Sequence, residues 1–281
     1  MRVLLLVKES SGSGSGPDGD ALARAMRDAG AEVDLRGAEE IDAIAATRPD
    51  RVVIASGDGN VAHVADAAGA AGVPLGVIPN GTANDFAGRM GIPADVLEAA
   101  RLAATGERLR TIDLARVGDH PFVNMATAGL AVAALRGAEP LKPLIGPAGY
   151  LVGAVRAGLT GRPVTCDVRC DGRRLYAGRA WQVMVACSGA FGAGSRVAEA
   201  DPSDGLLDVV VLAAGGRLRL VRHAYGLRRG RITEQPGVVG ARARRVELGL
   251  PPGAELNVDG DVEDAGPPLT VEPGRVRVVV G

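Results

Sequence analysis

The first 117 residues alternate short apolar runs with segments whose apolar positions recur at helical spacing. The expected strands are residues 3–7, 32–35, 51–55 and 75–78. The expected helices are residues 20–29, 39–46, 60–71 and 93–105. Strands that alternate with helices predict a parallel sheet with right-handed crossovers. The sequence therefore predicts an N-terminal open parallel α/β domain over residues 1–117.

The pattern changes near Gly118, after which strands follow one another with few helices between them. The expected strands are residues 121–127, 163–171, 174–187, 205–213, 242–249, 254–259 and 268–280. Helices are expected only near 146–159 and 216–228. Consecutive strands with Gly/Pro turns are typical of an antiparallel sandwich or a partly closed barrel. We therefore expect residues 118–281 to form a second, antiparallel β-sandwich-like domain.

Polar loops follow two neighbouring strands of the α/β domain. Strand 51–55 ends at SGDG (residues 56–59), and strand 75–78 ends at PNGTAND (residues 79–85). In an open α/β sheet, ligands bind at the carboxyl ends of the strands. Glycines let backbone amides approach a phosphate, and the N-terminus of the following helix favours its charge. The alternative is that both loops are turns with Gly and Asp for conformational reasons alone, and that Asp85 is a helix N-cap.

Composition excludes several classes of function. The net charge of −1 gives no basic surface for nucleic acid, and an aromatic content of 2% leaves few side chains for stacking on bases. Cys166 and Cys170 lie on one expected strand about 13 Å apart, too far to bridge, and the three histidines are too scattered for a zinc site. Residues 3–7 are too short for a signal peptide, and no apolar run approaches a membrane span. We expect a soluble, cytoplasmic protein.

The two loops also carry a family resemblance. SGDGN (residues 56–60) and PNGTANDF (residues 79–86) resemble the GGDGT and P-x-G-T-x-N-D-F motifs of the diacylglycerol kinase-like lipid kinases. That family includes sphingosine kinases and is more distantly related to NAD kinases. Further elements match in order, namely FVN at 122–124, DPSDGLLD at 201–208 and VDGD at 258–261. The resemblance implies a nucleotide-binding catalytic domain over 1–117 and a substrate and metal domain over 118–281.

The resemblance implies a phosphotransferase that uses ATP and Mg²⁺. Asp261 corresponds to the family's general base, which is a glutamate and therefore one methylene longer. The neighbouring Asp259 is the residue that would compensate for the shorter reach of Asp261. Asp58 would help to hold the phosphate-bound metal. The nucleotide would contact Ser11, Gly12, Gly57, Asp58, Gly59, Asn60, Thr82, Asn84, Asp85 and Asp113. For the segment around Asp261 the alternative is a surface Asp-Gly hairpin turn.

A structural Mg²⁺ site is also implied by the resemblance. Its ligands would be Asp201, Asp204 and the backbone carbonyl of Leu206. Without the resemblance, this segment is interpreted as an acidic turn before a strand.

A separate feature is the stretch 217–231, which holds six arginines and no acidic residue. It is either a solvated helix face or a contact for anionic lipid headgroups.

Three departures from the family pattern surround the expected nucleotide site. GGDGT is replaced by SGDGN, the family's following N-E is replaced by Ala62-His63, and the first loop keeps only Ser11-Gly12 of its motif.

We expect transfer of the γ-phosphate of ATP to a lipid hydroxyl such as that of diacylglycerol, in phospholipid metabolism. Two alternatives stay open: a kinase for a non-lipid alcohol (a nucleoside or secondary metabolite), and a degenerate protein that binds nucleotide or lipid without turnover. Peripheral membrane contact and a homodimer are compatible with each.

Overall fold

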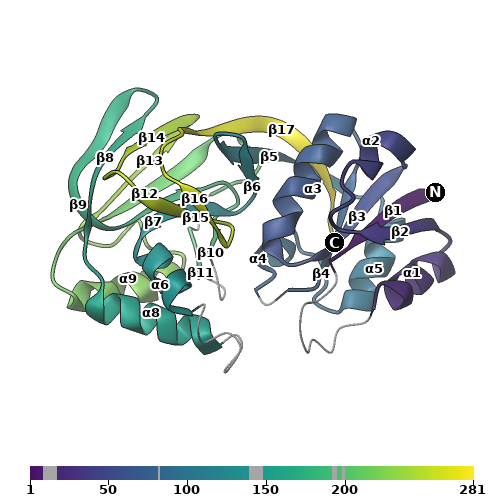
Figure 1. The fold of residues 1–281 in the computed structure, drawn as a ribbon, viewed down its shortest axis with the longest axis horizontal. Coiled ribbons are helices and arrows are strands. Elements are labelled where there is room, and N and C mark those ends of the chain that lie inside the picture. Colours follow the sequence, from purple (N-terminus) through teal and green to yellow (C-terminus); the bar gives the residue numbers. More distant parts are fainter. Residues whose placement is uncertain (9–17, 82, 139–147, 192–194, 198–199) are drawn as a thin grey trace. The chain divides into compact units, whose positions relative to one another are not determined.

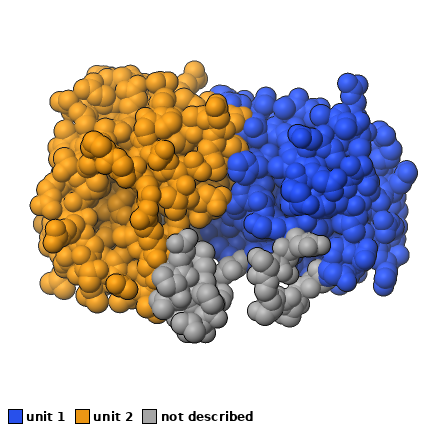
Figure 2. Space-filling view, viewed as in Figure 1, with its two compact units in different colours: residues 1–114, 272–281 blue, residues 115–271 orange. Residues whose placement is uncertain are grey.

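The computed structural model describes residues 1–8, 18–81, 83–138, 148–191, 195–197 and 200–281 (Figure 1). The chain forms two compact units, coloured separately in Figure 2. Unit 1 comprises residues 1–114 and 272–281, and unit 2 comprises residues 115–271. The last ten residues therefore return to the first unit, which the sequence pattern did not predict. Strands β5 (Leu109–Val117) and β17 (Leu269–Val279) each contribute residues to both units.

Unit 1 is built on a parallel sheet, as the β-α-β pattern predicts. Its strand order is β17-β4-β3-β1-β2, with β1 at Arg2–Val7, β2 at Glu32–Gly37, β3 at Arg51–Ser56 and β4 at Leu75–Pro79. All four described pairings in this sheet are parallel. β3 and β4 are buried along their whole length, so helices must cover both faces.

The helices of unit 1 lie on both faces of this sheet (Figure 1). They are α1 (Gly19–Asp28), α2 (Ala43–Thr47), α3 (Asp58–Ala71), α4 (Asp85–Arg89) and α5 (Val96–Thr105). α1 packs on α5, and α2 packs on α3. The carboxylates of Asp18 and Asp95 accept backbone N–H groups in the first turns of α1 and α5, which explains where these two helices begin.

Unit 2 is antiparallel throughout its described pairings, as expected for a β-sandwich-like domain. Its strands are β6 (His120–Phe122), β7 (Met125–Gly129), β8 (Val164–Cys170), β9 (Arg173–Ala186), β10 (Ala190–Phe191), β11 (Ser195–Arg196), β12 (Leu207–Ala213), β13 (Val238–Ala243), β14 (Arg245–Gly249), β15 (Glu255–Val258) and β16 (Asp261–Asp264). The order β16-β15-β7-β9-β8-β14 is the main path, and β12 pairs with both β9 and β13.

The long strand β9 separates the two cores of unit 2. Val183 and Val185 belong to one buried cluster, whereas Met184 and Ala186 belong to the other. Because successive side chains of a strand point to opposite faces, both faces of β9 are covered. Its second half is accordingly buried at every residue from Ala180 to Ala186.

Two expected strands of unit 2 are interrupted by a carboxylate. The strand expected over 121–127 divides into β6 and β7, because the backbone N–H groups of residues 123–125 point to Asp259. The strand expected over 242–249 divides at Arg244, because the N–H groups of Arg244 and Arg245 point to Asp171. An N–H bound to a side chain cannot also form the strand ladder, which explains both divisions.

Three helices of unit 2 are described: α6 (Leu130–Ala138), α8 (Ala148–Thr160) and α9 (Leu218–Arg228). The sequence pattern missed α6, and it offered α4 in unit 1 only through the alternative that Asp85 is a helix N-cap. Arg217, just before α9, donates to the carbonyls of Gly158 (2.7 Å) and Gly161 (3.0 Å), which ties α9 to the end of α8. Within the ranges described, no helix is both long enough and apolar enough to cross a membrane.

The three cysteines are buried and free, as expected from their spacing. Burial, with a smaller contribution from the charge of Asp171, raises the pKa of the Cys170 thiol to about 11. Burial likewise raises the pKa of Cys166. Both thiols are therefore protonated at neutral pH, which keeps them unreactive.

Candidate active site

The two polar loops of unit 1 lie side by side. β3 and β4 pair in parallel as far as Ser56 and Pro79, so both strands end at the same edge of the sheet. One residue further, the N–H of Asn80 donates to the carbonyl of Ser56 at 3.1 Å. The two loops therefore meet within unit 1.

Glycines permit a close approach between the loops. A Cβ placed on Gly81 would come within 2.4 Å of the Cα of Gly57, which is closer than any side chain tolerates. Asn84 closes the second loop by donating to the carbonyl of Gly81 at 2.9 Å and accepting from its N–H at 2.8 Å. Asn84 does so in the left-handed region, with φ of 51°. The loops are thus fixed by backbone contacts that only small residues allow.

Asp58 joins the first loop to the second. Its Oδ2 accepts the N–H of Asp85 at 3.1 Å, and its Oδ1 accepts the N–H of Phe86 at 3.0 Å. These are the first N–H groups of α4, so Asp58 performs the capping role that the sequence offered to Asp85. Asp85 is instead the first residue of α4, and Asn84 holds the N-cap position without a side-chain capping bond.

The glycine loop is shorter than the sequence pattern predicted, because α3 begins at Asp58 and not at residue 60. Asp58, Gly59 and Asn60 therefore form the first turn of the helix, and Gly57 is its N-cap. Glycine has no side chain to accept the N–H groups of that turn, and no side-chain capping bond is present. A helix N-terminus of this kind, at the end of a buried strand, suits an anion such as a nucleotide phosphate.

Asp261 lies in unit 2, at the start of β16 after a two-residue hairpin turn. Asp259 and Gly260 form the turn, with φ of 48° and 105°, as a type I′ hairpin requires. The Asp-Gly hairpin considered from the sequence is therefore present. The Asp261 side chain is exposed to solvent.

The neighbouring Asp259 has a function that sequence reasoning missed. Its carboxylate accepts the N–H groups of Val123 (2.8 Å), Asn124 (3.1 Å) and Met125 (2.8 Å). The N–H of Asp259 in turn donates to the carbonyl of Met125. Asp259 thus anchors the turn that carries Asp261. No spacing rule in the sequence signals that three consecutive amides bind one carboxylate.

The segment 201–208 is a tight acidic turn before β12. Asp201 Oδ1 accepts the N–H and the hydroxyl of Ser203, and Asp204 Oδ1 accepts the N–H of Leu206 at 2.9 Å. The other oxygen of Asp204 forms an ion pair with the guanidinium of Arg242. Two carboxylates and a carbonyl are the oxygen ligands that Mg²⁺ prefers, but the charge of one of them, Asp204, is already neutralised by Arg242. As arranged here, these residues do not fit a divalent cation.

The remaining predicted residues divide into two groups. Asp113 is buried in β5, with 2% of its surface exposed, and accepts the N–H of Gly274 at 2.8 Å. This bond holds the returning C-terminal segment, and a contact between Asp113 and the nucleotide stays a prediction. Ser11, Gly12 and Thr82 lie outside the described residues.

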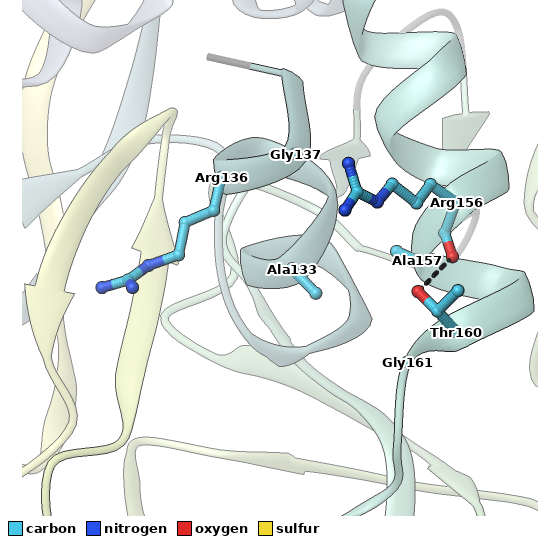
Figure 3. Close-up of a pocket in the computed structure, with 7 residues that line it drawn as sticks. All are labelled: Ala133, Arg136, Gly137, Arg156, Ala157, Thr160 and Gly161. Carbon is cyan, nitrogen blue, oxygen red and sulfur yellow. Dashed lines mark hydrogen bonds between the residues drawn. The ribbon is translucent and has the colours of Figure 1, made fainter. Parts of the chain in front are cut away.

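Two hollows in unit 2 contain none of the predicted residues. The first, of about 380 Å³, lies between α6 and α8 and is lined by Ala133, Arg136, Gly137, Arg156, Ala157, Thr160 and Gly161 (Figure 3). In Figure 3 the Arg136 side chain points away from α8, in keeping with its ion pair to Glu255. The second, of about 300 Å³, shares Ala133 and Arg136 with the first. Neither offers a carboxylate base, a phosphate loop and an acceptor position together.

Family models match both halves of the chain. The diacylglycerol kinase catalytic domain matches residues 2–117, and the YegS C-terminal NAD kinase beta sandwich-like domain matches residues 124–280. The chain belongs to the diacylglycerol kinase-like lipid kinase family. As a member of this family it is a lipid kinase-like phosphotransferase.

Relatives in this lipid kinase family cover most of the chain. A probable lipid kinase YegS-like of Pseudomonas aeruginosa is 31% identical over 280 residues, which are 92% of this chain and 88% of the relative. The diacylglycerol kinase of Bacillus subtilis is 29% identical over 219 residues, 75% of this chain and 71% of the relative.

Solved structures share the fold. A diacylglycerol kinase from Bacillus anthracis superposes with a TM-score of 0.79 at 21% identity, covering 100% of this chain and 97% of the other. An NAD kinase from Archaeoglobus fulgidus, solved in complex with ATP, superposes with a TM-score of 0.52 at 14% identity and covers 99% and 93% of the two chains. At these identities the likeness concerns the fold alone.

Proposed function

We propose that this chain transfers the γ-phosphate of ATP to the hydroxyl of a lipid such as diacylglycerol. The observation that carries the proposal is the joining of the two polar loops by Asp58 at the carboxyl edge of a parallel sheet. Membership of the lipid kinase family supports the same reaction. The fold by itself would not be sufficient, because one fold serves many chemistries.

The nucleotide end of the reaction belongs to unit 1. The N–H groups of the first turn of α3, which Gly57 does not cap with a side chain, bind the phosphates of ATP. Asn60 and Asn84 supply side-chain amide groups close to the same carboxyl edge of the parallel sheet. Asp58, held by the amides of Asp85 and Phe86, keeps the second loop against the first and adds negative charge next to the phosphates. Mg²⁺ bound with the nucleotide supplies positive charge that offsets the charge of the transferred phosphoryl group.

Asp261 acts as the general base. Its carboxylate accepts the proton of the lipid hydroxyl while that oxygen forms a bond to the γ-phosphorus and the bond to the β-phosphate oxygen breaks, so that ADP leaves. The proton then passes from Asp261 to solvent, to which its side chain is open. Asp259 fixes the turn through three N–H groups, which limits the freedom of Asp261 two residues later.

An apolar and basic surface in unit 2 supports a lipid acceptor. Helices α8 and α9 each expose three large apolar side chains at the spacing i, i+3, i+7, namely Val152, Val155 and Leu159 on α8 and Leu218, Val221 and Tyr225 on α9. Six exposed arginines accompany them, at positions 217, 219, 222, 228, 229 and 231. Apolar side chains among arginines suit the surface of an anionic bilayer, where the lipid substrate resides.

The experiment that tests the acceptor class uses labelled ATP. The protein is incubated with [γ-³²P]ATP, Mg²⁺ and a mixed lipid and metabolite extract, and the products are separated into organic and aqueous phases. We expect label in a lipid, and pure diacylglycerol in detergent micelles should then become labelled as phosphatidic acid. Label in a water-soluble product would indicate a non-lipid alcohol, and nucleotide binding without any labelled product would indicate a protein without turnover.

A further inference from the structure

Arg242 occupies the centre of the acidic turn that precedes β12. Its Nη2 pairs with Oδ2 of Asp204, and its Nε lies 3.5 Å from Oδ1 of Asp208. One guanidinium therefore links the turn to the strand that follows it. Asp208 is nearly buried, with 8% of its side chain exposed, so its charge needs a fixed counterion.

The fold places Arg242 opposite these acids by strand register. β12 and β13 are antiparallel, and Asp208 lies directly across from Arg242. Cross-strand partners have Cβ atoms about 5 Å apart, which is within the reach of an arginine side chain. The pairing with Asp204 then follows, because Asp204 is bound to the N–H of Leu206 at the start of the same strand.

One of these two acids, Asp204, is also among those that would hold a divalent cation. A cation at Asp201, Asp204 and the carbonyl of Leu206 would share the Asp204 carboxylate with Arg242, which contacts Oδ2, and with the N–H of Leu206, which contacts Oδ1. Two cations at one carboxylate repel each other, so the guanidinium of Arg242 disfavours a metal ion at Asp204. An arginine is always charged and presents its donors in a fixed fork, which suits it to hold two carboxylates.

We propose that in this chain the guanidinium of Arg242 takes the place of a structural divalent cation. The turn at residues 201–206 is thereby fixed to β12 and β13 without metal. This inference does not depend on the proposed phosphotransfer, and its test contains no nucleotide. A negative result for the role of Arg242 would therefore not affect the proposed phosphotransfer, and the reverse also holds.

Thermal unfolding of the full chain without nucleotide tests the proposal. We expect the same melting temperature in EDTA and in millimolar MgCl₂. In Arg242→Gln the melting temperature should fall by about 2–4 °C in EDTA, because two carboxylates lose their counterion. Arg244→Gln is the matched control, since Arg244 is an exposed arginine two residues away whose bonds to Asp171 come from its backbone N–H. An Arg242→Gln protein as stable as this control would overturn the proposal.

Direct metal binding provides the second measurement, and it needs no variant that is at risk of misfolding. Mn²⁺ is titrated into the wild-type chain without nucleotide and followed by electron paramagnetic resonance. We expect no stoichiometric Mn²⁺ at this turn. One bound Mn²⁺ per chain that disappears in Asp204→Asn would show that the turn holds a metal after all and would reject the replacement.

Discussion

Asp58 and Phe86 are joined by a hydrogen bond of 3.0 Å from the backbone N–H of Phe86 to Oδ1 of Asp58. The other oxygen of the same carboxylate accepts the N–H of Asp85. One side chain on α3 thus determines where α4 begins, and with it the position of the second polar loop. Asp58 therefore stabilises the local structure in addition to placing a negative charge at the site.

Asp58→Asn should lower the free energy of unfolding by about 1–3 kcal/mol. Asparagine keeps one acceptor oxygen, but its NH₂ group faces the second backbone N–H, and the bonds to a charged group are lost. Urea denaturation followed by circular dichroism measures the change. Asp66→Asn, in the same helix, is the control and should cost less, because its ion pair with Arg275 is partly exposed. Equal stability of Asp58→Asn and the wild type would show that the capping bonds are not needed.

Asp259→Asn should reduce stability and turnover together. The asparagine oxygen can accept from fewer of the three N–H groups at residues 123–125, so we expect a loss of about 2 kcal/mol or more in the free energy of unfolding. Because the turn that positions Asp261 loosens, kcat should fall while KM for ATP changes little. Asp264→Asn, exposed in the same hairpin, is the control. A normal kcat in a folded Asp259→Asn protein would remove Asp259 as a positioning residue.

The order of elements is the part of the fold that the sequence predicts well. Unit 1 follows from buried β-branched runs such as residues 51–55, which end at Gly and Asp. Failures occur where long-range side-chain contacts override the local pattern. The expected strand 121–127 is interrupted because Asp259, 136 residues away from Val123, binds its amides. The return of residues 272–281 to unit 1 is equally invisible, because parallel pairing of Val278 with Leu75 leaves no local mark.

His223 should make stability depend on pH. It is buried in α9, with 2% of its surface exposed, and burial lowers its pKa below the usual 6.5, outweighing the bond to the carbonyl of Pro236. Its Nδ1 has no hydrogen-bond partner among the residues described, so a proton there would be buried without an acceptor. The unfolded chain therefore binds the proton more tightly, and stability is lost as the pH falls below 6.5 toward the lowered pKa.

The measurement for His223 is the free energy of unfolding between pH 8 and pH 5. The slope contributed by this one histidine can reach about 1.4 kcal/mol per pH unit and should be absent in His223→Gln. His120→Gln is the control for a partly exposed histidine, whose Nδ1 lies 3.1 Å from Glu263 and so has an acidic partner. Identical pH profiles for wild type and His223→Gln would contradict the account.

The surface of α8 and α9 should bind anionic vesicles. A double variant Leu218→Asp and Val221→Asp removes two exposed apolar side chains and adds two negative charges among the arginines. We expect binding to vesicles of phosphatidylglycerol, measured by co-sedimentation, to weaken about tenfold or more. Leu109→Asp replaces an exposed leucine of unit 1 and should leave binding unchanged. Binding unaffected by the double variant would assign membrane contact to another surface.

The candidate site is predictable only in part. The loops at residues 56–60 and 79–85 can be found because Gly, Asn and Asp follow two buried strands, and the structure brings them together. The functions of individual carboxylates are not visible in the sequence. Asp58 and Asp259 bind backbone N–H groups, and which acid does so depends on distant segments of the chain. The approach of Asp261 to the loops of unit 1 stays a prediction.

The most direct test of the account is the rate of phosphate transfer from [γ-³²P]ATP to diacylglycerol micelles by the wild type and by Asp261→Asn. Thermal unfolding should show that both proteins are folded, since Asp261 is exposed at the start of β16. Loss of a general base predicts a rate lower by about 100-fold or more with unchanged ATP binding. Transfer by Asp261→Asn at the wild-type rate would contradict the claim that this carboxylate accepts the proton of the lipid hydroxyl.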